Sequence, residues 1–95
     1  MMKLEPITYR ITTVSGPVLV SGFAIDAKCG VRICVREEPP YWVADHYDTG
    51  YRIGNLHLTG EKAAIAAIDI IKRHIASGKY AAAIAAIEAP NYEPI

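Results

Sequence analysis

The periodicity of the chain changes near residue 59, and this change limits the folds that the sequence can adopt. Before it, β-branched and aromatic residues alternate with polar ones between turn signals, which is the period of two that a half-buried strand needs. After it, eleven alanines and seven isoleucines fall between Ala63 and Ala89. Strands followed by helices indicate an α+β fold, in which the helices cover one face of an antiparallel sheet.

The first part of the chain predicts a sheet of four or five strands. Apolar and polar residues alternate over about Ile7–Val14 and Val31–Arg36, and a more apolar strand, Val18–Ile25, lies between them. Turn residues separate the three segments. We expect Glu37–Pro40 to be irregular, because two prolines cannot donate to a strand ladder.

A hairpin is predicted next, from Tyr41–Tyr47 and Tyr51–Leu58 around the loop Asp48–Gly50. A three-residue loop that ends in glycine fits a type I turn with a G1 bulge. This register would pair Tyr47 with Tyr51 and Ala44 with Gly54, and it would leave apolar side chains on both faces of the hairpin.

Two helices are predicted after the hairpin. Thr59 is a suitable N-cap and Ser77–Gly78 a suitable stop, so the first helix should run over residues 59–77. A second helix should run from Lys79 to Glu88, before Pro90 and a tail over residues 90–95. We expect the first helix to pack on one face of the sheet, through a stripe of apolar residues that includes Ile68, Ile71 and Ile75. The strand residues expected beneath it are Ile7, Tyr9, Ile11, Val31, Ile33 and Val35.

The length of 95 residues predicts a single domain over residues 1–95, strand-rich over 5–58 and helical over 59–89. Hydrophobic residues make up 52% of the chain, which excludes an intrinsically disordered protein. Ten basic residues balance ten acidic ones, so a uniformly basic protein held on phosphates by bulk charge is also excluded.

The sequence leads us to expect a cytoplasmic protein. Residues 1–6 contain an acid and a proline and are not followed by the apolar run of a secretory signal. The apolar stretch from Ala63 to Ala76 is too short and too charged to span a membrane. Cys29 and Cys34 are expected to be reduced thiols in the cytoplasm, with no disulfide between them.

No metal, cofactor or catalytic residue is predicted. Cys29 and Cys34 lack a second pair of ligands at a spacing typical of zinc sites. Asp45 and His46 are neighbours on a strand, so their side chains should point to opposite faces and could not form a dyad. We therefore expect that the protein is not an enzyme, and an enzyme of unknown class is only the third hypothesis.

Single-stranded nucleic acid is the alternative ligand that the sequence favours most. Arginines on the polar side of the predicted strands, beside tyrosine and tryptophan rings, are typical of surfaces that bind phosphates and stack bases. The candidate residues of such a face are Arg10, Arg32, Arg36 and Arg52.

The preferred hypothesis is a non-enzymatic module that binds another protein or itself. Helices can cover only one side of the sheet, so apolar side chains of the predicted hairpin would be left over. A monomer rarely exposes a large contiguous apolar patch, and twofold dimers are the commonest soluble oligomers. We expect a homodimer, with no membrane partner. The candidate self-association residues are Val43, Tyr47, Tyr51 and Ile53, with the Trp42–Leu56 side as the other choice.

Overall fold

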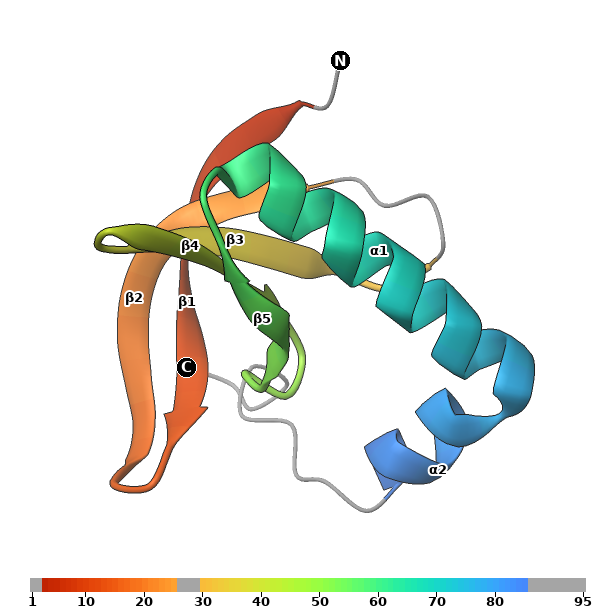
Figure 1. Cartoon of the computed structure of the whole chain (residues 1–95). Helices are drawn as coiled ribbons and strands as arrows, with labels where there is room; N and C mark the ends of the chain where they lie inside the picture. Colours follow the sequence, from red (N-terminus) through yellow and green to blue (C-terminus); the bar gives the residue numbers. More distant parts are fainter. Residues whose placement is uncertain (1–2, 26–29, 86–95) are drawn as a thin grey trace.

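The computed structural model describes residues 3–25 and 30–85, which form a five-stranded antiparallel sheet followed by a long helix and a short one (Figure 1). The predicted α+β fold is confirmed. Neighbouring strands in the sheet are also neighbours in the sequence, so the sheet is a meander. In chain order the elements are β1 (Leu4–Thr13), β2 (Gly16–Ile25), β3 (Ile33–Glu38), β4 (Tyr41–His46), β5 (Arg52–His57), α1 (Gly60–Ser77) and α2 (Lys79–Ala85).

The turn between β3 and β4 is tighter than the sequence suggested. Glu37 and Glu38 were expected to be irregular, but both belong to β3, and only Pro39 and Pro40 form the turn. A two-residue turn keeps the prolines out of the ladder and pairs Glu37 directly with Trp42. The prediction of an irregular segment over all four residues was therefore wrong. Cys29, Glu88 and the tail over 90–95 lie outside the described residues.

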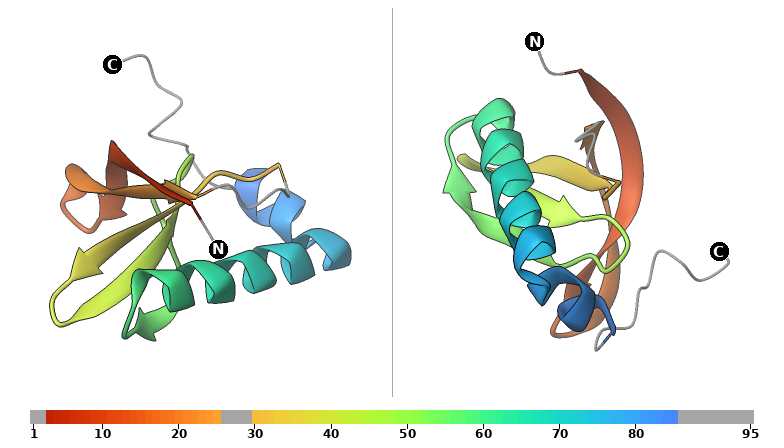
Figure 2. Two further views of the ribbon diagram at one scale, coloured as in Figure 1. Left: turned by 90° about the horizontal axis from the view of Figure 1, so that it is seen from above. Right: turned by 90° about the vertical axis from the view of Figure 1, so that its right-hand side faces the viewer.

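Helix α1 covers one face of β3, β4 and β5, as Figure 2 shows. The Thr59 hydroxyl accepts a hydrogen bond from the backbone N–H of Lys62, and Gly78 closes the helix in the left-handed conformation. Neither α1 nor α2 combines enough length and apolar character to cross a membrane. We call this side of the sheet the helix face. Its core consists of Ile25, Ile33, Val35, Ala44, Ile53, Ala63, Ala64, Ala67 and Ile71.

The expectation that Ile7, Tyr9 and Ile11 lie beneath the helix was wrong. Ile33 and Val35 do lie there, but Tyr9 pairs with Val20 in a register that places odd-numbered β1 residues on the opposite side of the sheet. Alternation predicts which residues share a face within one strand. The turn between β1 and β2 sets how that pattern aligns with the next strand, and a shift of one residue exchanges the faces.

The β4–β5 register also differs from the prediction. Ala44 pairs with Ile53 and Asp45 with Arg52, rather than Ala44 with Gly54, and a bulge shifts the register between Trp42 and Ala44. Ile53 therefore enters the core beneath α1 instead of the opposite face. The His46 N–H donates to the Tyr51 carbonyl oxygen, so the loop is Tyr47–Gly50, one residue longer than the predicted Asp48–Gly50.

Two hydrogen bonds join the β4–β5 loop to β1. The N–H of Thr12 donates to the Gly50 carbonyl oxygen over 3.0 Å, and the Thr12 hydroxyl donates to the Thr49 carbonyl oxygen. The sheet is therefore curled, so that β1 reaches back across the side away from α1 (Figure 2). We call this side the second face. It carries Tyr9, Cys34, Arg36, Val43 and Asp45.

Candidate functional site

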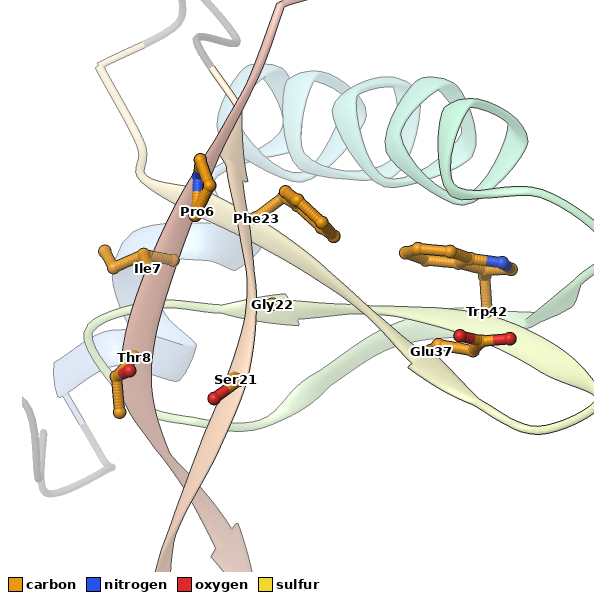
Figure 3. Close-up of a pocket in the computed structure, with 8 residues that line it drawn as sticks. All are labelled: Pro6, Ile7, Thr8, Ser21, Gly22, Phe23, Glu37 and Trp42. Carbon is orange, nitrogen blue, oxygen red and sulfur yellow. The ribbon is translucent and has the colours of Figure 1, made fainter.

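A pocket of about 560 Å³ opens on the sheet beside the first turn of α1 (Figure 3). Phe23 of β2 and Trp42 of β4 are half-buried, and their ring centroids are 6.1 Å apart. We call it the Phe23–Trp42 pocket. The residues that line it are Pro6, Ile7, Thr8, Ser21, Gly22, Phe23, Glu37 and Trp42.

Two close backbone approaches hold this pocket in shape. A side-chain carbon at Gly22 would collide with the Val35 carbonyl oxygen, so only glycine lets β2 cross β3 so closely. A side-chain carbon at Gly60 would lie 3.0 Å from the Trp42 ring, so the missing side chain lets the indole pack against the start of α1. The ring is thereby held with one edge on the helix, while the pocket remains open.

Glu37 supplies the charge of the pocket. It is exposed, and it is the ionisable residue among the eight described residues that line the pocket. Within residues 3–25 and 30–85 its carboxylate makes no ion pair. Glu37 and Trp42 are direct cross-strand partners, so the carboxylate lies beside the indole, as Figure 3 shows. An aromatic pair beside a carboxylate is suited to an organic cation.

The sequence did not identify this pocket, although part of its signal was present. A two-residue Pro39–Pro40 turn would have placed Glu37 opposite Trp42 by simple counting. The approach of Phe23 depends on how closely β2 crosses β3 at Gly22, and a glycine in a strand does not by itself show which strand lies against it.

The second face holds a buried polar network instead. Asp45 is 1% exposed, and its Oδ2 accepts hydrogen bonds from the Tyr9 hydroxyl over 2.6 Å and from Arg36 Nε over 2.8 Å. Arg36 also donates to Glu38, which accepts a further hydrogen bond from Arg52. The network thus pairs two carboxylates, Asp45 and Glu38, with two guanidinium groups, Arg36 and Arg52.

These contacts shift the pKa values of the groups that take part. Burial, and then the bond to Asp45, raises the pKa of the Tyr9 hydroxyl well above its usual value. Burial alone would lower the pKa of Arg36, but the Asp45 carboxylate outweighs it and the pKa is raised. Burial and the Asp45 charge raise the pKa of Cys34 to about 12. Tyr9 and Cys34 therefore remain neutral and Arg36 charged near neutral pH, which is suited to a structural role.

His46 makes a second set of buried contacts, on the helix face. Its Nδ1 lies 2.9 Å from the Thr49 hydroxyl, and its Nε2 lies 2.8 Å from the hydroxyl of Tyr80 in α2. Burial lowers the pKa of the His46 imidazole. As predicted, Asp45 and His46 point to opposite faces. Cys34 pairs with Asp45 in the register, so His46 does not meet that thiol either.

The four arginines predicted for a nucleic-acid face do not form one basic surface. Arg32 lies over the Tyr47 ring and bonds Asp48 over 2.7 Å. Arg36 and Arg52 share the Glu38 carboxylate. Arg10 lies on β1, on the side away from Tyr9.

The four candidate self-association residues are not brought together on the surface either. Val43 is 0% exposed on the second face, and Ile53 is 7% exposed in the core beneath α1. Tyr47 is half-buried beneath Arg32, whereas Tyr51 is exposed. The predicted patch required Val43 and Ile53 on one face, and the pairing of Ile53 with Ala44 separates them. On the other predicted side, Trp42 lines the pocket and Leu56 is exposed.

Comparison of the chain with protein-family models, with curated proteins and with solved structures finds no match.

Proposed function

We propose that this protein is a non-enzymatic protein-interaction module and that the Phe23–Trp42 pocket is its binding site. The observation that carries the proposal is an open pocket that combines two half-buried aromatic rings with a carboxylate that has no ion-pair partner in the described chain. Aromatic anchors of this kind dominate the binding energy of protein interfaces.

The remaining chemistry supports a binding role over an enzymatic one. Asp45 and His46 are buried and held by hydrogen bonds: Asp45 accepts from Tyr9 and Arg36, and His46 contacts Thr49 and Tyr80. Their burial and these bonds favour a role in stabilising the fold. The Phe23–Trp42 pocket, in contrast, is open, and the Glu37 carboxylate in it makes no ion pair within the described residues.

The charge of the pocket favours a protein over the alternative, a single-stranded nucleic acid. Arg32, Arg36 and Arg52 each have a carboxylate partner, so much of their charge is already neutralised. Glu37 would repel a phosphate that entered the pocket. We further propose that the protein acts in the cytoplasm, where reducing conditions would preserve the free, buried Cys34 thiol.

Site-specific photo-crosslinking tests the binding site. A benzoylphenylalanine placed at Ser21, which lines the pocket, should capture a partner that the same group at the exposed Lys72 of α1 does not. The purified partner should then bind the unmodified protein, as measured by calorimetry. Ser21→Trp, which fills the pocket, should weaken that binding at least tenfold, whereas Lys72→Trp should not.

The proposal fails if positions 21 and 72 capture the same proteins. It also fails if Ser21→Trp binds the purified partner as tightly as the unmodified protein does.

Self-association is the second candidate function. Strand β5 is the last strand of the sheet, Leu56 within it is 46% exposed, and Leu58 after it is 70% exposed. An edge strand with exposed apolar side chains is a template for pairing with another chain.

A further inference from the structure

We propose that the side chain held in the Phe23–Trp42 pocket is an arginine of the partner protein, with its guanidinium against Trp42 and bonded to Glu37. This inference rests on the proposed function, because it names the ligand of the same pocket. Charge, geometry and a similar arrangement elsewhere in the chain support this ligand.

The arginine next to Glu37 in the sequence does not neutralise it. Arg36 precedes Glu37 on β3, but successive residues of a strand point to opposite faces. The Arg36 guanidinium is therefore on the second face, where Asp45 and Glu38 bind it. Glu37 remains on the pocket side with its carboxylate unneutralised by the described residues. A cation of the partner protein would neutralise this carboxylate.

The Trp42 ring and the Glu37 carboxylate lie close enough to hold one planar cation. Cross-strand partners have Cβ atoms about 4.5–5.5 Å apart, so a planar group lying on Trp42 is within reach of the Glu37 carboxylate. Phe23 faces Trp42 across the pocket and closes the apolar side, as Figure 3 shows. The volume of about 560 Å³ is within the usual range of roughly 300–1,000 Å³ for ligand pockets.

The same combination occurs elsewhere among the described residues, at the surface and with its cation present. The Arg32 guanidinium lies 4.3 Å from the centre of the Tyr47 ring and donates to Asp48 over 2.7 Å. An aromatic face and a carboxylate thus bind the same guanidinium. The pocket repeats the aromatic face and the carboxylate, in Trp42 and Glu37, and lacks the guanidinium among the described residues.

Arginine fits these two groups better than lysine. The guanidinium is planar, so it can stack on an indole while its edge donates two hydrogen bonds to one carboxylate. An ammonium group is more strongly hydrated and makes a point contact. The exposed hydroxyls of Thr8 and Ser21, across the pocket, can bond the backbone of the segment that carries the arginine.

Trp42 provides the signal for the test, because it is the single tryptophan of the chain. The probe is the capped tripeptide acetyl-Gly-Arg-Gly-amide, and the indole N–H is followed by ¹⁵N NMR during a titration. We expect the indole signal to move and to saturate with a dissociation constant on the order of 1–10 mM. The lysine tripeptide should bind several-fold more weakly. The citrulline tripeptide, which has nearly the same shape without the charge, should leave the signal in place.

Glu37→Gln should weaken the arginine tripeptide at least fivefold, and the matched control Glu61→Gln, at an exposed acid in the first turn of α1, should leave binding unchanged. Both positions are exposed, and a native-like NMR spectrum of each variant shows that it folds. The inference is overturned if citrulline moves the signal as arginine does, if Glu37→Gln binds normally, or if the arginine tripeptide has no effect at about 50 mM.

These results are separable from the test of the proposed function. Crosslinking from Ser21 detects a partner whatever side chain enters the pocket. Capture from Ser21 together with no response to arginine would retain the interaction module and reject the arginine.

Discussion

At the scale of single residues, the molecule depends on a few buried polar side chains that bond each other across long sequence distances. Tyr9 and Asp45 are 36 positions apart, and their contact closes the second face of the sheet. Such networks are stable only when every member is bonded, because a buried charge without a partner is costly. In the described part of the chain, every buried side-chain nitrogen and oxygen has a hydrogen-bond partner.

Asp45→Asn should therefore destabilise the protein strongly. The substitution leaves the Arg36 guanidinium half-enclosed without its main counter-charge, and breaking a buried pair in this way costs about 3–5 kcal/mol. Urea denaturation measures the loss. The control is Asp69→Asn, which breaks the exposed pair with Arg73 and should cost less than about 1 kcal/mol. Similar losses in the two variants would contradict the structural role of Asp45.

His46 should make stability depend on pH. Burial lowers the pKa of this imidazole in the folded state, so the unfolded chain takes up a proton near pH 6.5 while the folded chain resists it. The stabilisation from neutral His46 is complete above about pH 6.5 and declines as the pH falls through the unfolded value, by at most about 1.4 kcal/mol per unit. Urea denaturation at pH 7.5 and pH 5.5 should show this decline in the native protein.

The comparison variant is His46→Gln, which cannot titrate and should lose that part of the pH dependence. His74→Gln, at an exposed position on α1, should keep it. The interpretation is wrong if the His46 variant declines as steeply as the native protein.

At the scale of elements, α1 packs on the sheet through most of the expected stripe, with Ala64, Ile68 and Ile71 at the core and Ile65 and Ile75 outside it. Ile71 is 5% exposed, but Ile75 is 42% and Ile65 is 54% exposed. Small residues fill the contact: Ala63, Ala64 and Ala67 are buried and bring the helix close to the strands. The predicted stripe is therefore confirmed at Ile68 and Ile71, and Ile75 was wrongly placed in it.

Ile71→Ala should cost about 2–5 kcal/mol, because the substitution leaves a cavity between α1 and the sheet. The matched substitution Ile75→Ala, one turn further along the helix, should cost less than about 1 kcal/mol. Both losses are measured by urea denaturation. A larger loss for Ile75→Ala than for Ile71→Ala would mean that Ile75, and not Ile71, is buried against the sheet.

Two glycine substitutions test the contact between the β4–β5 loop and β1. Gly50 has a positive φ of 74°, and a side-chain carbon there would lie 2.7 Å from the backbone nitrogen of Thr12. Gly78 has a similar φ of 80° with open space around it. Gly78→Ala should cost about 1–2 kcal/mol from backbone strain alone. Gly50→Ala should cost about 1–3 kcal/mol more, from the collision with β1. Equal losses by thermal denaturation would show that β1 does not depend on this contact.

At the scale of the whole molecule, β5 forms one edge of the sheet. We propose a homodimer through β5, and we expect light scattering to give about twice the monomer mass of 10.4 kDa at a concentration of about 100 µM. Leu58→Asp should shift the species toward monomer, and Leu19→Asp, at a residue of β2 that is 60% exposed, should not. A native protein with the monomer mass at that concentration would reject the dimer.

Local sequence signals were sufficient for much of the fold. The period of two before residue 59, the Thr59 cap and the Gly78 stop identified the sheet and α1 to within a few residues. The alternation along β4 also separated Asp45 from His46 correctly. These features depend on the backbone geometry of one strand or one helix, so a short stretch of sequence carries them.

The candidate site depended on tertiary structure. The loop Tyr47–Gly50, one residue longer than predicted, paired Ile53 with Ala44 and so moved it into the core, and the curl of β1 placed Tyr9 on Asp45 instead of beneath α1. Phe23 meets Trp42 because Gly22 lets β2 cross β3 closely. Each of these outcomes is set by contacts between segments that are distant in sequence. A periodic pattern assigns side chains to the two faces of one strand, but the packing of the other strands decides which face becomes core and which becomes a pocket.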